Sequence, residues 1–492
     1  MSVRSTFEST ILPITSVFAG VVSIFGVAML APALLVFAAR DPAQPAFLRS
    51  ALIVFAPAVI VWLATRRFRR ELRVRDGILL VTFMWATLPA LAAMPLLIGI
   101  PGLSFTGAYF ESVSGLTTTG ATVLSGLDQL PASLNLWRHL LHWFGGMGNI
   151  VLAVAILPLL GIGGMQLHRA ETPGPMKDSK LTPRIAHTVK ALWYVYAGLT
   201  LVCALTLKLC GMSWFDAVCH AFSTLALGGF STHDRSIGYF DSVPIELALS
   251  FFQILAALNF ATHFTVLRQR ALKLYLRDSE AVALLKTLLL SVVGIAIFLQ
   301  LKGTYPDFLV ALRHASFNVI TTATTGGFFS QDFNRWPLFA PMMMLFLSCI
   351  VASSGSTGGG LRMIRMLVLM KSAWREMLRI LHPGLSMPVK IGESVIENKV
   401  VMSVLAFVVV YFMSIVSLTL LLLASGLDLT SSISAVISCI NSSGPGLGAI
   451  GPLSNYGVLS DFQQWVCTVA MLLGRLEVFT LVLVFTRAFW RK

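Results

Sequence analysis

Residues 114–122 read Ser-Gly-Leu-Thr-Thr-Thr-Gly-Ala-Thr, a short turn rich in hydroxyl side chains and glycine. Similar turns recur three more times, at residues 223–232, 320–330 and 438–446. Each follows an apolar segment of about ten to fifteen residues, which is too short to cross a bilayer and favours a re-entrant half-helix. Each also precedes a full-length apolar span. The pattern predicts a fourfold repeat of long span, short helix, glycine turn and long span.

The four turns align on one glycine each: Gly120, Gly229, Gly327 and Gly444. A hydroxyl residue then stands six positions before every one of these glycines: Ser114, Ser223, Thr321 and Ser438. Such agreement is difficult to obtain by chance, so the turns are predicted to be structurally equivalent. Irregular backbone survives at membrane depth only where it is buried in protein or lines water. We therefore expect the four turns to meet around one axis.

A ring of such turns suits an alkali cation. Glycine permits backbone conformations that other residues avoid, so successive carbonyl groups can point the same way, and hydroxyl groups add oxygen without adding charge. Oxygens arranged in a ring replace the water around the ion. The short helices would aim their partly negative C-terminal ends at the same point. One such turn alone would more simply be a packing turn, but four equivalent copies favour a cation pathway.

Composition excludes a soluble globule. The chain has 492 residues, of which 56% are hydrophobic and 12% charged, and its mean hydropathy is +0.81. These values are typical of an all-α polytopic membrane protein. The net charge of +14 does not indicate a nucleic-acid partner, because most Lys and Arg residues fall in alternate loops and at the C-terminus. Basic loops face the cytoplasm, so both termini are predicted to be cytoplasmic. The basic segments are residues 66–75, 169–190, 268–277, 362–399 and 487–492.

The repeats divide the chain into five parts. Two apolar spans without a glycine turn occupy residues 1–76 and are predicted to form a peripheral transmembrane pair. The four membrane-pore-membrane repeats follow, with boundaries at residues 77–186, 187–279, 280–398 and 399–492.

The inner span of the third repeat is interrupted at residues 352–360, which read Ala-Ser-Ser-Gly-Ser-Thr-Gly-Gly-Gly. A helix broken at mid-membrane must satisfy its free backbone groups, and a water-filled pore would do so. We interpret this segment as a hinge or gate loop below the four turns. A passive kink is the alternative.

The inner span of the fourth repeat contains Gly474-Arg475-Leu476-Glu477. Charged side chains in an apolar helix should face protein or water and not lipid. Residues two positions apart point to different faces of a helix, so these two are poor partners for each other. Arg475 is expected to contact carbonyl groups or residues 352–360, or to lie at the pore wall as an electrostatic barrier. Glu477 is expected to join a network between helices.

Together, these motifs closely resemble the TrkH/TrkG branch of the Trk/Ktr/HKT superfamily of potassium transporters. The likeness covers nearly the whole chain, including the N-terminal pair of spans. The combination of these motifs is specific to that branch. The segments that carry it are residues 110–115, 117–122, 143–148, 228–234, 353–360 and 474–477.

The resemblance implies four membrane-pore-membrane repeats around a single potassium pathway. It implies that one glycine from each repeat lines a selectivity filter, although the doublets at residues 228–229 and 326–327 leave the register open by one residue. We call the following the filter residues, expected to bind K⁺: Thr118, Thr119, Gly120, Leu227, Gly228, Gly229, Thr325, Gly326, Gly327, Ser442, Ser443 and Gly444. The gate residues implied in the same way are Gly355, Ser356, Thr357, Gly358, Gly359, Gly360 and Arg475.

Partners are also implied by the resemblance. Members of the superfamily form homodimers and associate with a cytosolic nucleotide-binding regulatory subunit of the TrkA type. The basic loops at residues 169–190, 268–277 and 362–399 are reasonable docking surfaces. Two details depart from the expected pattern and could alter ion preference: residues 225–227 provide the second turn with no hydroxyl group, and Asn149 is a polar residue in the first inner span.

The resulting prediction is potassium uptake across the bacterial inner membrane, with K⁺ as transported ion and no cofactor in this chain. No Gly-x-x-x-x-Gly-Lys-Ser/Thr motif is present, so the energy must come from the membrane potential or a coupled ion. The alternative is a Na⁺-preferring or Na⁺-coupled transporter of the same fold. An intramembrane enzyme using His142, His220 or His314 is disfavoured, because no Gly-x-Ser-x-Gly or His-Glu-x-x-His motif accompanies them.

Overall fold

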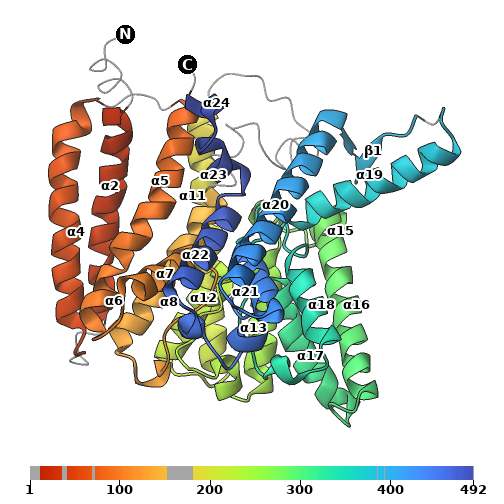
Figure 1. Ribbon diagram of the computed structural model, residues 1–492, viewed down its shortest axis with the longest axis horizontal. Coiled ribbons are helices and arrows are strands. Elements are labelled where there is room, and N and C mark those ends of the chain that lie inside the picture. Colours follow the sequence, from red (N-terminus) through yellow and green to blue (C-terminus); the bar gives the residue numbers. More distant parts are fainter. Residues whose placement is uncertain are drawn as a thin grey trace.

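The computed structural model describes residues 11–35, 41–68, 73–151, 181–384, 386–392 and 394–490. These residues form a helical molecule with one small hairpin (Figure 1). Within them, six helices are long and apolar enough to cross a membrane, or seven if one bent pair forms a single span. The six comprise two near the N-terminus and the first long helix of each repeat: Leu12–Leu34, Gln44–Phe68, Arg75–Gly99, Thr188–Leu209, Ser279–Leu301 and Asn398–Ala424. The prediction of an all-α polytopic protein with an extra N-terminal pair is confirmed.

The N-terminal helices pack against each other at one edge of the molecule (Figure 1). They are α2 (Leu12–Ala28), α3 (Leu30–Leu35) and α4 (Gln44–Thr65), followed by the 3-10 turn η3 (Arg66–Phe68). The first repeat comprises α5 (Val74–Ala92), α6 (Met94–Gly99), α7 (Phe105–Leu116), η4 (Leu127–Gln129) and α8 (Ala132–Val151). The predicted basic loop at residues 169–190 lies largely outside the described residues.

The second repeat comprises α11 (Leu181–Leu209), α12 (Trp214–Ala226), η6 (Ser236–Tyr239), α13 (Val243–Ala257), α14 (Phe260–Gln269) and α15 (Lys273–Arg277). The third comprises α16 (Ser279–Leu301), α17 (Phe308–Ala323), η7 (Phe333–Arg335), α18 (Phe339–Ser348), α19 (Met363–Leu381), β1 (Val389–Ile391) and β2 (Ser394–Ile396). The fourth comprises α20 (Asn398–Ala424), α21 (Leu429–Asn441), η8 (Gly448–Ile450), η9 (Tyr456–Val458), α22 (Asp461–Arg475), α23 (Phe479–Val484) and α24 (Arg487–Trp490).

The four short helices of the repeats, which we call the pore helices, are α7, α12, α17 and α21. Each begins where a side-chain oxygen accepts a hydrogen bond from a backbone N–H in the first turn, the usual signal for a helix start. The capping residues are Ser104, Ser213, Asp307 and Asp428. These caps fix where each pore helix begins, and a glycine turn follows the C-terminal end of each one.

The inner spans of the second and fourth repeats are not the full-length helices expected from the sequence. In the second repeat, α13 and α14 meet at an angle of 97°. The break occurs because Leu258 is extended and the Asn259 side chain caps α14 by accepting a hydrogen bond from the Ala261 N–H at 2.8 Å. In the fourth repeat, the break separates α22 from α23. The predicted interruption in the third repeat is confirmed, because residues 349–362 join α18 to α19 without a helix.

The antiparallel hairpin of β1 and β2 pairs Val389 with Ile396 and Ile391 with Ser394. Apolar side chains of the hairpin are buried against α19 and α20. In Figure 1, α19 extends away from the helical body, and the hairpin lies at the same end.

Candidate functional site

The four glycine turns have the same backbone conformation. Each aligned glycine has a left-handed φ, between 76° and 80°. Two positions earlier, each turn has a second left-handed residue, whose φ lies between 52° and 62°: Thr118, Leu227, Thr325 and Ser442. Side chains other than glycine adopt this conformation at a cost, so its repetition in four turns indicates a constrained structure. Because Gly229 and Gly327 carry the left-handed φ, they, and not Gly228 and Gly326, match Gly120 and Gly444 in conformation.

A hydrogen bond closes every turn in the same way. In each turn, the donor is the backbone N–H of the residue just before the aligned glycine. The acceptor is the backbone carbonyl of the hydroxyl residue that stands six positions before that glycine. The distances are 2.8 Å for Thr119 N to Ser114 O, 2.9 Å for Gly228 N to Ser223 O, 2.6 Å for Gly326 N to Thr321 O, and 2.9 Å for Ser443 N to Ser438 O. The equivalence predicted from the spacing of these residues is confirmed.

The four glycines lie close together. A Cβ atom added to Gly120 would overlap the carbonyl oxygen of Gly228, and one on Gly229 would lie 2.6 Å from the Gly327 backbone. A Cβ on Gly444 would lie 2.9 Å from the Thr119 carbonyl oxygen. No side chain fits at these positions unless the backbone moves. The tertiary structure therefore brings the four turns, distant in sequence, around a common axis.

A cavity of about 180 Å³ opens next to this ring. It is lined by all four aligned glycines and by polar side chains of three repeats, among them Arg138 of α8 and the loop residues His233, Asp234 and Asn455. An ion could approach the ring of backbone oxygens through this cavity.

The loops that follow the first two glycine turns are joined by charged side chains. His233 Nδ1 lies 2.5 Å from Asp128 Oδ1, and Asp234 accepts from the Leu127 N–H at 3.1 Å. Although partial burial alone would lower it, the pKa of His233 is raised above 6.5, because hydrogen bonds and charges of Asp216 and Asp128 favour the imidazolium. His233 therefore links the two loops through carboxylates that favour its imidazolium form.

Residues 352–360 lie against the other side of the turns. The Thr357 hydroxyl donates to the Leu225 carbonyl at 2.9 Å, and the Gly359 N–H donates to the Thr325 hydroxyl at 3.3 Å. A Cβ on Gly359 would overlap the Asn441 carbonyl oxygen. The loop thus contacts the second, third and fourth turns directly, which places it where the sequence predicted.

The bend between α13 and α14 holds this loop. The free carbonyl of Ala257 accepts from the Ser353 N–H at 3.0 Å, and the Phe260 N–H donates to the Gly355 carbonyl at 3.1 Å. Two broken helices therefore satisfy each other's backbone groups, which must be paired in an apolar medium. The polar Asn259 is the sequence signal for this bend, which the predicted full-length inner span did not include.

Arg475 contacts carbonyl groups, as expected. The guanidinium donates to the Gly145 carbonyl, and its Nη1 lies 3.5 Å from the Thr357 carbonyl oxygen. Asn149 also donates to this loop, with its Nδ2 3.3 Å from the carbonyl oxygens of both Ser356 and Thr357. One arginine and one amide from neighbouring inner helices therefore fix the middle of the loop.

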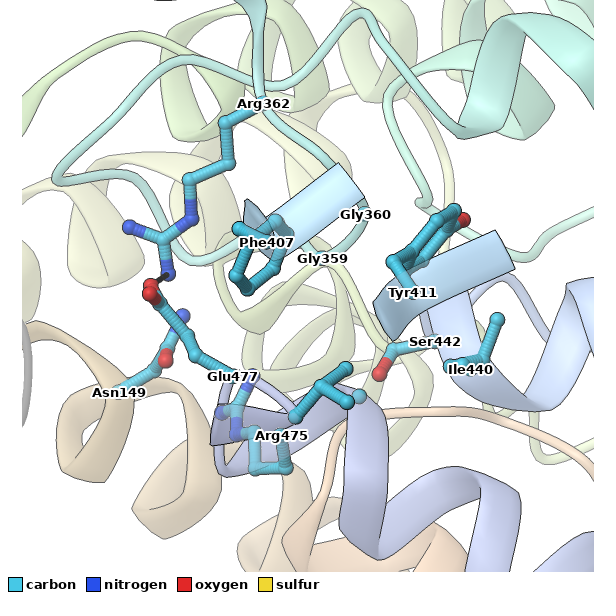
Figure 2. Close-up of a pocket in the computed structure, with 13 residues that line it drawn as sticks. Asn149, Gly359, Gly360, Arg362, Phe407, Tyr411, Ile440, Ser442, Arg475 and Glu477 are labelled. Atoms are coloured by element: carbon cyan, nitrogen blue, oxygen red, sulfur yellow. Dashed lines mark ion pairs between the residues drawn. The ribbon is translucent and has the colours of Figure 1, made fainter. Parts of the chain in front are cut away.

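Glu477 forms the expected contacts between helices. Its carboxylate lies 2.9 Å from the Arg362 guanidinium and 2.5 Å from that of Arg365. Figure 2 shows Arg362 and Arg475 on either side of Glu477, close to Gly359 and Gly360. Arg362, Glu477 and Val478 all have positive φ values, so the backbone is strained where the loop meets the break between α22 and α23.

The histidines considered for an enzymatic site pack separately. His142 stacks on Phe230 with ring centroids 4.1 Å apart and lies 3.0 Å from the Ser223 hydroxyl, whereas His314 lies against Tyr305. In the described part of the chain, no three His, Cys, Asp or Glu side chains form a group that could hold a metal ion.

The fold and the site define a multi-pass membrane protein in which four membrane-pore-membrane repeats surround one axis. The chain matches the family model of TrkH, described as a cation transport protein, over residues 43–492. It belongs to this family, and is therefore a transporter and not an enzyme.

Several relatives are similar over nearly the full length. The Trk system potassium uptake protein TrkH of Halomonas elongata is 45% identical over 469 residues, which are 95% of this chain and 97% of that protein. TrkH of Escherichia coli K12 is 42% identical over 97% of this chain and 99% of its own length. TrkG of the same organism is 37% identical over 95% of this chain and 96% of its own length.

The crystal structure of the potassium transporter TrkH from Vibrio parahaemolyticus has the same fold. It superposes with a TM-score of 0.91 at 41% sequence identity, covering 98% of this chain and 100% of that chain. The assignment to the TrkH/TrkG branch is confirmed.

Proposed function

We propose that this chain takes up K⁺ across the bacterial inner membrane through the ring formed by its four turns. The observation that carries the proposal is the shared conformation of the turns, whose left-handed glycines approach one another so closely that no Cβ fits. Backbone oxygens in such a ring can replace the hydration shell of a cation. In this proposal, the twelve filter residues bind K⁺ and set the ion preference. The names of the relatives, which are potassium uptake proteins, agree with K⁺ as cargo.

Gating is proposed for the gate residues below the ring. Thr357 and Gly359 contact the turns, so the loop obstructs the same axis when it is in this position. Arg475 adds a positive charge beside the loop, which disfavours the passage of a cation. Opening would require the loop to leave its contacts with α8, α13 and α22.

Orientation, partners and repeat boundaries belong to the same proposal. We place the basic segments, and with them both termini, in the cytoplasm. We propose a homodimer that binds a TrkA-type nucleotide-binding subunit at the basic loops, and repeats with boundaries at residues 77–186, 187–279, 280–398 and 399–492. The leading helices α5, α11, α16 and α20 begin one to six residues before these boundaries. The relatives' names as parts of a Trk system are consistent with such an assembly.

The test uses a bacterial strain that lacks its own potassium uptake systems, with the regulatory subunit co-expressed. The parent protein should restore growth on low K⁺ and accumulate Rb⁺, and excess Na⁺ should compete weakly. Gly120→Asp should reach the membrane and transport nothing, because its side chain overlaps the Gly228 backbone.

Gly303→Asp is the matched control. Gly303 also has a positive φ, 69°, but no atom lies within 4 Å of the added Cβ. This variant should transport like the parent. Failure of the parent to rescue growth, strong inhibition by Na⁺, or normal transport by Gly120→Asp would overturn the proposed function.

A further inference from the structure

Each pore helix carries a polar side chain that holds the chain segment leaving its own glycine turn. In the first three repeats, this residue stands nine positions before the aligned glycine: Glu111, His220 and Asn318. In the fourth repeat, Ser434 stands ten positions before Gly444 and has the same contact. We call these four residues the braces.

The braces contact equivalent places. Glu111 accepts from the Val123 N–H at 2.9 Å, and Asn318 accepts from the Ser330 N–H at 3.2 Å. The Ser434 hydroxyl accepts from the Leu447 N–H at 2.9 Å. In each case, the N–H belongs to the residue three positions after the aligned glycine. In the second repeat, His220 instead contacts the hydroxyl of Ser231, two positions after Gly229, at 2.9 Å.

The brace of the first repeat is charged. Glu111 is fully buried, and its carboxylate also accepts from the Thr122 hydroxyl at 3.0 Å. Arg138 of α8, also fully buried, provides the opposite charge, with Nε 2.7 Å from Glu111 Oε1. Removing one partner of such a pair leaves a buried charge without compensation, which is far less favourable than the intact pair.

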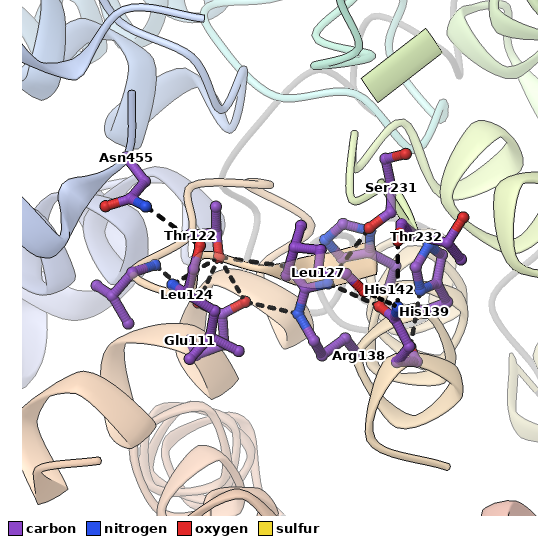
Figure 3. Close-up of polar contacts among 12 residues, drawn as sticks. Glu111, Thr122, Leu124, Leu127, Arg138, His139, His142, Ser231, Thr232 and Asn455 are labelled. Atoms are coloured by element: carbon purple, nitrogen blue, oxygen red, sulfur yellow. Dashed lines mark hydrogen bonds and ion pairs between the residues drawn. The ribbon is translucent and has the colours of Figure 1, made fainter. Parts of the chain in front are cut away.

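Arg138 also reaches the second turn. Its Nη1 donates to the Ser231 carbonyl at 3.3 Å, and its guanidinium lies 4.2 Å from the centre of the Phe230 ring. Its Nη2 lies 3.3 Å from the Thr122 hydroxyl. Figure 3 shows the Arg138 side chain reaching Glu111, with Thr122 beside that carboxylate and Ser231 on a separate segment. One guanidinium therefore joins the segments that follow Gly120 and Gly229.

We propose that Arg138 and Glu111 are positioning residues for the filter: together they hold the first and second turns at a fixed separation and thereby set ion preference. The second turn is where such support is needed, because residues 225–227 offer no hydroxyl groups of their own. The planar fork of arginine reaches several acceptors at once, which a lysine ammonium cannot do in the same geometry. The inference rests on the proposed K⁺ pathway and deepens it.

The experiment measures Rb⁺ and Na⁺ uptake into liposomes that contain the purified protein, together with its thermal unfolding in detergent. Arg138→Lys retains a cation for Glu111 but loses the fork to Ser231. Its Rb⁺-over-Na⁺ uptake ratio should fall about tenfold, the effect expected from losing a hydrogen bond to a charged group. Its unfolding temperature should fall as well, because the Ser231 carbonyl loses its partner at a buried site. Glu111→Gln keeps the shape of the brace, loses its charge, and should lower the ratio further.

Glu246→Gln is the matched control. Glu246 is buried and pairs with Arg313 at 2.8 Å at the outer end of another pore helix, away from the filter residues. This variant should keep the parent ratio. Unchanged ratios in both Arg138→Lys and Glu111→Gln would overturn the inference, whether or not the variants unfold earlier, since the pair would then serve stability alone. A parent that shows no preference for Rb⁺ would instead refute the proposed function.

Discussion

At the scale of single residues, glycine is required where two backbones meet. Gly145 of α8 lies against the Leu116 carbonyl, and Gly474 of α22 lies against the Ile440 carbonyl. In both cases, an inner helix approaches the end of its own pore helix, so a Cβ would overlap a carbonyl oxygen. Small residues permit such close approach between membrane helices.

Gly474→Ala should therefore destabilise the protein although alanine favours helix. We expect the free energy of unfolding to fall by about 1–3 kcal/mol, as for other insertions into a packed core. Thermal unfolding in detergent measures this change. Gly198→Ala in α11 is the control, because nothing lies within 4 Å of its added Cβ. At this position, the higher helix propensity of alanine should raise the free energy of unfolding by up to about 1 kcal/mol. Equal effects of the two substitutions would contradict the packing argument.

The His233 contact gives a pH dependence at the residue scale. The pKa of His233 is raised above 6.5, so its stabilising contribution is complete below 6.5 and is lost as pH rises through the folded-state value. Asp128 acts in the opposite direction. Partial burial favours its neutral form, but hydrogen bonds from His233 and the Asp234 N–H dominate and lower its pKa, so its contribution is lost only in strong acid.

His233→Gln should accordingly unfold at a lower temperature than the parent at about pH 5.5, and the difference should shrink as pH rises above about 6.5 through the folded-state pKa of His233. Thermal unfolding across this range measures it. A difference that grows with pH would show that the neutral imidazole, and not the imidazolium, stabilises the loops.

At the scale of elements, the loop at residues 352–360 is held by groups from other helices more than by its own turns. Backbone groups of the loop form hydrogen bonds with Asn149, with the bend at Asn259 and with Arg475. A loop fixed by a few hydrogen bonds has a position that small changes in free energy can shift.

Asn149→Ala should raise the basal Rb⁺ flux through the protein. It removes two hydrogen bonds to loop carbonyls, each worth about 0.5–1.5 kcal/mol, so a several-fold increase is expected. Rb⁺ uptake into liposomes without the regulatory subunit measures it. Thr206→Ala serves as control, because the Thr206 hydroxyl bonds only within its own helix, to the Val202 carbonyl. Unchanged flux in Asn149→Ala would mean that this amide does not hold the loop closed.

The contact of Glu477 with two arginines joins the loop to the fourth repeat. Glu477→Gln should lower the free energy of unfolding by about 3–5 kcal/mol, because Arg362 and Arg365 would remain buried without their anion. Glu376→Gln changes an exposed carboxylate that also faces two arginines, so its effect should stay below about 1 kcal/mol. Comparable unfolding temperatures for the two variants would argue against a structural role for the buried contact of Glu477 with Arg362 and Arg365.

At the scale of the whole molecule, charge decides the orientation. The proposed topology places the end of α19 in the cytoplasm and the loop between α16 and α17 outside. In a variant without native cysteines, Gly384→Cys should react with an impermeant thiol reagent only after the cells are opened. Gly303→Cys should react in intact cells. The reverse pattern would invert the proposed topology.

Much of this architecture was predictable from sequence because it repeats. The spacing from Ser114 to Gly120 recurs in three other places, and the structure shows the same hydrogen bond in each turn. Arg475 and Glu477 could be assigned to buried contacts because charges in apolar helices must find partners. The bend at Asn259 was not predictable in the same way, because a single capping residue competes with strong apolar periodicity on both sides.

The sequence by itself determined the membrane class, the four repeats and the position of the broken helix, since these follow from local hydropathy, glycine and spacing. Only the tertiary structure decided which turn faces which, and that Arg138 of one helix joins Glu111 and Ser231 of two different segments. Such contacts depend on how the repeats pack around the axis. The physical reason is that a buried polar group requires a partner, whereas its position in the chain does not specify which partner it will find.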